Sequence, residues 1–256
     1  MEWERIRKRP EDFVGANLQD YEAYAKGFAW SQARALLDGL PDGGINIAHE
    51  AVDRHVLANR GDKLALRWIG RDDQVRDFSY VALRAQTNRF ANILAQCGVA
   101  KGDRVFSLLG RVPELYIAAL GTLKNGSVFS PLFSAFGPDP IKARMTIGNA
   151  RVLVTSEAFY RRKIEPWRKD LASLEHVFLT ECSGGLPAGT IDLSAALARA
   201  SAIAPAFAST PVTAIPARAS GRLKFPAPQK RSRTRRAGSA SVRTVSTRSR
   251  FAAGFT

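Results

Sequence analysis

Apolar runs and helical periods alternate through the middle of the chain. The mostly apolar run at 105–109 follows a Lys-Gly-Asp turn, as expected of a buried parallel strand. Pro113 has the position of a proline in the first turn of a helix, and apolar residues then recur at helical spacing until Gly126. A second apolar run covers 128–133. We therefore predict a strand, a helix and a parallel strand, joined by a right-handed crossover.

The same alternation extends on both sides of this unit. Ser79 can cap a helix over 80–97 that Gly98 ends, and a turn separates two short runs that suit a hairpin. We predict helices or helical segments at 45–57, 141–148, 159–171 and 193–204, the hairpin at 64–69 and 74–78, and strands at 151–155 and 176–180. Alternating strands and helices predict an α/β fold with a mostly parallel sheet and flanking helices.

We predict three segments along the chain. Residues 1–44 suit a mostly helical or irregular lead-in, and we expect its aromatic side chains to pack on the domain, namely Tyr21, Tyr24, Phe28 and Trp30. Residues 45–200 carry the α/β pattern. Residues 201–256 hold eleven Lys or Arg and no Asp or Glu, so they supply most of the net charge of +15. Because this segment also lacks apolar periodicity, we predict a disordered basic tail.

Two origins remain open for the tail. Its Arg, Ser, Ala, Thr and Pro content, from about residue 205, is typical of a GC-rich gene read out of frame, and a genuine basic extension is the alternative. The basic run at 229–236 suggests an alternative function, non-specific binding of nucleic acid or an anionic surface by phosphate neutralisation. The tail has few aromatic residues for base stacking, so specific recognition is not expected.

Several function classes find no support in the sequence. There is no apolar run near the roughly 20 residues of a membrane span, and the charged N-terminus is no secretory signal, so we predict a cytoplasmic protein with no membrane partner. Cys97 and Cys182 form no metal or redox motif and suit free thiols. The histidines lack metal-ligand spacing, no Ser/His/Asp grouping is present, and we interpret Glu157 and Glu165 as surface carboxylates.

Three stretches carry a family resemblance: INIAHEAVDRH at 45–55, KGDRVFSLLGRVPELYIAALGTLKNGSVFSPLFSAF at 101–136 and ARVLVTSEAFYRR at 150–162. In this order and spacing they resemble the adenylate-forming acyl-CoA synthetases, most closely the acetate–CoA ligase branch. The resemblance runs from about residue 28 to about 181. It implies that the α/β segment is part of the N-terminal subdomain of that fold, in an enzyme that forms acetyl-CoA from ATP, acetate and CoA.

The resemblance also implies a position for the CoA nucleotide. Phe133 with the small residues Ser134 and Ala135 would contact its adenine end, and Arg161 would pair with its 3′-phosphate. Some relatives have a second arginine where this chain has Ile164, and Arg162 or Lys163 are candidates to replace it. The alternatives are that Phe133 is a core residue and that Arg161 belongs to a solvated basic turn.

Other parts of the family pattern are missing. The Ser-Gly-Thr-Thr-Gly phosphate loop with its Pro-Lys-Gly sequence does not occur in 182–256, nor do the acetate-pocket segments and the C-terminal lysine domain. The sequence therefore matches the first quarter to third of such an enzyme. We expect no catalytic residue, no metal site and no ATP or Mg site in it, residual CoA binding at most, and no activity of this chain alone. The small-molecule partners implied are CoA and acetate or another short acyl group.

Overall fold

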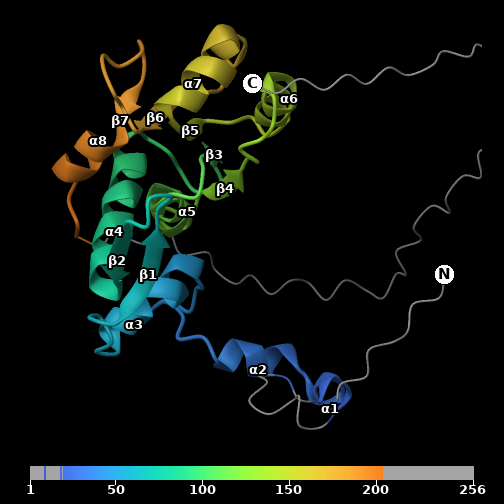
Figure 1. The fold of residues 1–256 in the computed structure, drawn as a ribbon. Helices are drawn as coiled ribbons and strands as arrows, with labels where there is room; N and C mark the ends of the chain where they lie inside the picture. The colour runs from blue at the N-terminus through green and yellow to red at the C-terminus, as the bar shows by residue number, and fades with distance from the viewer. Residues whose placement is uncertain (1–8, 10–17, 19, 204–256) are drawn as a thin grey trace, which may run out of the picture. The chain divides into compact units, whose positions relative to one another are not determined.

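A parallel sheet forms the centre of the structure, a computed structural model that describes residues 9, 18 and 20–203. Within these residues five strands pair in the order β4-β3-β5-β6-β7 (Figure 1). Their bounds are β3 Arg104–Leu108, β4 Val128–Pro131, β5 Val152–Ser156, β6 His176–Thr180 and β7 Ile191–Asp192. All neighbouring pairs run parallel, which confirms the predicted sheet.

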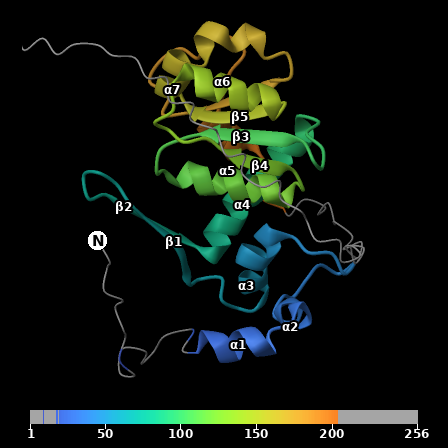
Figure 2. The same cartoon turned by 90° about the vertical axis from the view of Figure 1, so that its right-hand side faces the viewer.

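Helices cover both faces of this sheet (Figure 2). One layer holds α4 (Tyr80–Gln96), α5 (Pro113–Lys124) and α8 (Leu193–Arg199), and the other holds α6 (Pro138–Ile147) and α7 (Glu157–Lys163). Side chains alternate between the layers as the pleat requires: Val105 packs with α4 and α5, whereas Phe106 packs with α6. Both faces are buried, which explains the almost continuous apolar character of the strands.

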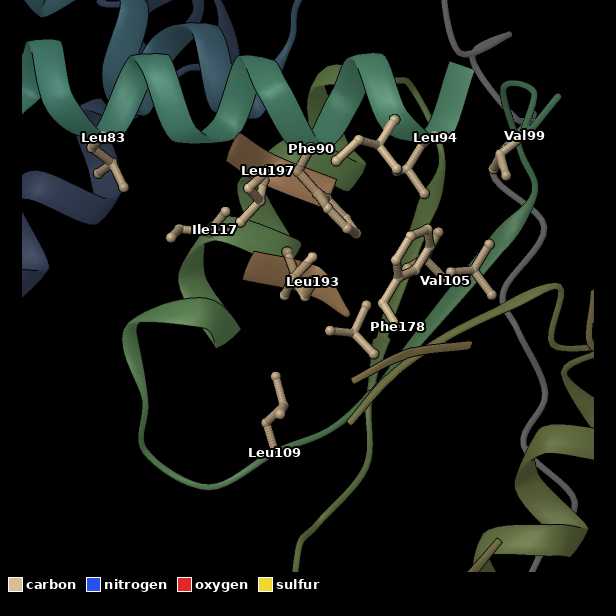
Figure 3. Close-up of a cluster of buried hydrophobic side chains, with 14 of the residues drawn as sticks. Leu83, Phe90, Leu94, Val99, Val105, Leu109, Ile117, Phe178, Leu193 and Leu197 are labelled. Atoms are coloured by element: carbon tan, nitrogen blue, oxygen red, sulfur yellow. The ribbon is translucent and has the colours of Figure 1, made fainter. Parts of the chain in front are cut away.

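The core under α4 is the larger of the two clusters of buried side chains (Figure 3). Phe90 from α4 meets Phe178 from β6 edge to face, with ring centroids 5.9 Å apart. Helices α4 and α5 approach closely at Gly121, where an added Cβ would lie 2.8 Å from the Phe90 ring. The predicted stop signals are confirmed, because Gly98 and Gly126 both adopt positive φ after α4 and α5.

The strand order places a switch in direction at the middle of the sheet. From β3 the chain steps to β4 on one side, then returns past β3 to β5, β6 and β7 on the other. The loops that leave β3 and β5 therefore diverge. In open α/β sheets ligands bind at the carboxyl ends of strands near such a switch.

Smaller elements precede the sheet. They are α1 (Tyr21–Gly27), α2 (Trp30–Ala35), the π-helix η2 (His49–Asp53), α3 (Arg54–Leu57) and the hairpin of β1 (Leu64–Ile69) with β2 (Val75–Ser79). The hairpin and the Ser79 cap confirm the prediction, with Ser79 Oγ accepting from the Ala82 amide at 3.3 Å. A short 3₁₀ segment, η3 (Glu165–Asp170), follows α7.

One charged pair is buried where the π-helix meets α4 and α5. The Lys124 side chain is fully buried, and its Nζ donates to Asp53 Oδ1 at 2.9 Å and to Asn88 Oδ1 at 2.6 Å. Arg84 also lies 3.1 Å from Asp53. Burial lowers the pKa of Lys124, and the charge of Asp53 opposes that effect.

Some sequence predictions need correction. The lead-in aromatics do not pack on the domain: Tyr21 and Trp30 are 70% and 81% exposed, and Phe28 contacts Tyr24 and Trp30 instead. In the helical segment predicted at 45–57, from the apolar residues Ile47, Ala51, Val52 and Val56, Val52 is buried as expected, but Ile47 is 62% exposed and Ala48 is buried in its place. The sequence pattern missed β7, and β4 ends at Pro131, two residues earlier than predicted.

The end of the described chain lies along α4. Asn88 donates to the carbonyl of Ala202, and Asn92 donates to those of Ser201 and Ile203. The predicted tail begins at residue 201, and its part from residue 204 onward lies outside the described residues, together with the basic run on which the nucleic-acid alternative depends. Among the helices that the structure describes, none has both the length and the apolar character needed to cross a membrane.

Candidate functional site

The loop that follows β4 presents an aromatic ring to solvent. The Leu132 amide still donates to Ser107 O at 2.7 Å, and the chain then turns so that the Phe136 amide reaches Phe133 O at 3.0 Å. Phe133 is 63% exposed, and its ring meets the Phe136 ring edge to face at 5.5 Å. The alternative of a core role for Phe133 is therefore wrong. Its ring is accessible to a flat ligand.

Arg161 lies on α7 and is held by its neighbours. Its Nε and Nη2 lie 2.8 and 2.7 Å from Glu157 Oε1, and Nη2 also donates to the Gly185 carbonyl at 3.1 Å. The side chain remains 46% exposed, and no described residue binds Nη1. The guanidinium is therefore oriented and keeps one donor edge, instead of moving freely in solvent.

Glu157 is not the surface carboxylate that the sequence suggested. It is 7% exposed, and its Oε2 accepts the Ser183 amide at 2.9 Å while Oε1 accepts from Arg161. The Ser183 amide and the Arg161 guanidinium hold the pKa of Glu157 below its usual value. No local pattern in the sequence signals this burial, because Ser183 comes from a distant loop.

The basic residues after Arg161 differ in their surroundings. Lys163 is only 8% exposed, and its Nζ donates to the carbonyls of Ser134 and Phe136 at 2.6 and 2.7 Å. Because it is engaged in this way, the idea that Lys163 replaces the second phosphate-binding arginine is wrong. Arg162 is exposed and lies 5.6 Å from the centre of the Phe159 ring. Lys163 thus joins the loop that bears Phe133, Ser134 and Ala135 to the helix that bears Arg161.

The larger cavities of the described structure do not contain these residues. One of about 570 Å³ lies between the β1–β2 hairpin, α4, the start of α5 and α8, with Arg76 and Glu114 paired across it at 3.4 Å. Another of about 380 Å³ lies on α6, and a smaller one of about 270 Å³ lies where the sheet changes direction, between Leu109, Ser156 and Thr180. The described residues form no group of three or more His, Cys, Asp or Glu that would hold a metal ion.

Comparisons with known proteins agree with this fold. The family model of the AMP-binding enzymes matches residues 52–217. The acetyl-coenzyme A synthetase of Bacillus subtilis (strain 168) is 37% identical over 166 residues, which cover 64% of this chain and 28% of that protein. The acetyl-coenzyme A synthetase of Deinococcus radiodurans is 31% identical over 187 residues, 69% of this chain and 28% of that protein.

A solved structure gives the same result. The crystal structure of Brucella canis acyl-CoA synthetase superposes with a TM-score of 0.63 at 34% sequence identity, and covers 71% of this chain and 32% of that one. The chain thus spans between a quarter and a third of the length of these relatives. Because the family model of the AMP-binding enzymes matches more than half of its residues, this chain belongs to that family.

Proposed function

We propose that the chain corresponds to the N-terminal part of an acetate–CoA ligase, which joins acetate and CoA at the expense of ATP and releases acetyl-CoA, AMP and diphosphate. The observation that carries the proposal is the similarity to acetyl-coenzyme A synthetases, at 37% and 31% identity over 64% and 69% of this chain. Another short acyl group in place of acetate fits equally well, because the acetate-pocket segments are not in the sequence.

The contribution of this chain would be one end of the CoA site. Phe133 offers an exposed ring to the adenine, and the small side chains of Ser134 and Ala135 allow the base to approach the backbone. Arg161 offers Nη1 to the 3′-phosphate, in an orientation that Glu157 and Gly185 already fix. CoA supplies the thiol that accepts the acyl group, and these residues would only bind and orient its nucleotide.

The residues present do not fit ATP and Mg. The phosphate loop of the family is missing from 182–256, and the described residues provide no cluster of metal ligands. We therefore assign no step of the reaction to this chain. We expect weak CoA binding, in the millimolar range or poorer, because a single charge-assisted contact contributes only about 1.5–3 kcal/mol.

A ligand titration tests this assignment. CoA and dephospho-CoA, which lacks the 3′-phosphate, are added separately to 15N-labelled protein, and amide shifts are followed by NMR. We expect CoA to bind at least about tenfold more tightly, and Arg161→Gln to abolish that preference. Arg162→Gln is the matched control, since it removes an adjacent exposed cation, and it should keep the preference. Equal affinity of both ligands for the unmodified protein would exclude the 3′-phosphate role of Arg161.

A further inference from the structure

A buried ammonium group supports the loop of the proposed CoA site from behind. Lys163 is 8% exposed, and burial lowers its pKa. A buried ammonium needs partners, since an unpaired charge in the interior is costly. Lys163 has two, the carbonyl oxygens of Ser134 and Phe136, and its Nζ also lies 5.0 Å from the centre of the Phe159 ring.

These contacts determine how the loop is presented. With the carbonyls of Ser134 and Phe136 directed at Lys163, the loop backbone is fixed on its inner side. The Phe133 ring between β4 and this anchor is left exposed. Within the loop the Phe136 amide donates to Phe133 O, and the Phe136 ring contacts the Arg144 guanidinium of α6 at 4.4 Å. The two bonds from Lys163 attach the loop backbone to α7.

The anchor lies on the same short helix as Arg161. Helix α7 spans Glu157–Lys163, and its first residue holds Arg161 while its last residue holds the loop. Glu157 in turn accepts the Ser183 amide, which attaches the helix to the segment after β6. The aromatic half and the arginine half of the proposed site therefore share one rigid support.

We propose that Lys163 is a positioning residue for CoA: it sets the 133–136 loop relative to α7, so that the adenine and the 3′-phosphate are bound at a fixed separation. This inference rests on the proposed function for its ligand, but the anchoring itself is measurable without ligand. Lys163 does not touch the nucleotide in this proposal. It acts through the Ser134 and Phe136 carbonyls.

The first measurement uses the unmodified protein. NMR of lysine ammonium groups at low temperature should show the Lys163 protons exchanging slowly with water, because two carbonyls hold them. Exposed Lys169 is the internal reference and should exchange too fast to be observed. Fast exchange at Lys163 would overturn the proposal without any question of whether a variant folds.

The second measurement compares variants. Lys163→Met removes the donors and keeps the length of the side chain, and Arg162→Met is the matched control on the next residue. We expect Lys163→Met to raise hydrogen exchange of the Phe136 amide about tenfold or more, while the amides of β5 stay protected. Arg162→Met should leave both unchanged. A loss of protection across β5 as well, or none at Phe136, would refute a local positioning role.

The ligand arm separates this inference from the proposed function. Lys163→Met should lower the affinities for CoA and dephospho-CoA by the same factor, about tenfold, so the preference for CoA is kept. Arg161→Gln should instead abolish the preference for CoA over dephospho-CoA. If the unmodified protein binds neither ligand, the CoA assignment fails, and the exchange measurements still decide whether Lys163 anchors the loop. Unchanged affinity in Lys163→Met with a detached loop would refute its role in positioning CoA.

Discussion

Individual charged residues in the described part of the chain have specific partners, and Glu157 gives the clearest pH dependence. Its pKa is lower in the folded protein than its ordinary value, because the Ser183 amide and Arg161 stabilise the carboxylate. A depressed carboxyl pKa adds stability that is complete above the unfolded-state pKa, near 4.3, and is lost as pH falls through the folded-state value.

We therefore expect Glu157→Gln to lower the free energy of unfolding at pH 7, and the difference from the unmodified protein to shrink when both are measured near pH 3.5. Urea unfolding at the two pH values measures this double difference. Glu165→Gln removes an exposed carboxylate and should change stability little at either pH. A difference that stays constant with pH would show that the Glu157 carboxylate is not preferentially stabilised in the folded state.

Lys124 is the second residue whose removal should have a large effect. Lys124→Met would leave the buried Asp53 carboxylate with Arg84 as its remaining cation, and breaking a buried pair costs about 3–5 kcal/mol. We expect Lys124→Met to lower the free energy of unfolding, measured in urea, by about 3 kcal/mol, the lower end of that range, because Arg84 still neutralises part of the Asp53 charge. Lys169→Met, at an exposed position, should cost less than about 0.5 kcal/mol. An equally small loss of stability in Lys124→Met would contradict the stabilising role of the buried pair of Lys124 and Asp53.

At the scale of elements, the close contact of α4 with α5 leaves no room for a side chain at Gly121. An alanine usually stabilises a helix relative to glycine, by about 1 kcal/mol. At Gly121 the new methyl would lie 2.8 Å from Phe90 Cδ1 and 3.0 Å from Thr87 O, so the helices must move apart. We expect Gly121→Ala to cost about 1–3 kcal/mol in urea unfolding. Gly110→Ala, which meets nothing within 4 Å, is the control and should be close to neutral.

Elements were predictable from sequence where local pattern and burial agree. Both ends of the strand His176–Thr180 match the prediction. A short apolar run with polar flanks is typical of a strand that is buried on both faces of a sheet. Strand β7 has two residues and therefore no period to detect. Phe133 and Arg161 were proposed only through family resemblance. Glu157 and Lys163 were misjudged, since their burial depends on Ser183, Ser134 and Phe136, which are far away in sequence.

At the scale of the whole molecule, the part of the chain that matches its relatives makes up only 28% of their length. Without the phosphate loop it should not form an acyl-adenylate. We expect acetate-dependent exchange of pyrophosphate into ATP to stay at background with the purified chain, and the complete Bacillus subtilis relative serves as positive control. Clear acetate-dependent exchange by this chain would show that residues outside the known family pattern bind the triphosphate.

In the π-helix at His49–Asp53, the number of residues matters more for the fold than the identity of the exposed ones. The Arg54 amide reaches back to His49 O, so this turn contains one residue more than an α-helical turn. Removing one residue would rotate everything before it by about 100° relative to α3. That rotation would take Ala48 out of the interior. A substitution at Ala51, by contrast, changes only an exposed side chain. Single-residue deletions here should therefore be selected against in evolution, whereas substitutions at Ala51 accumulate.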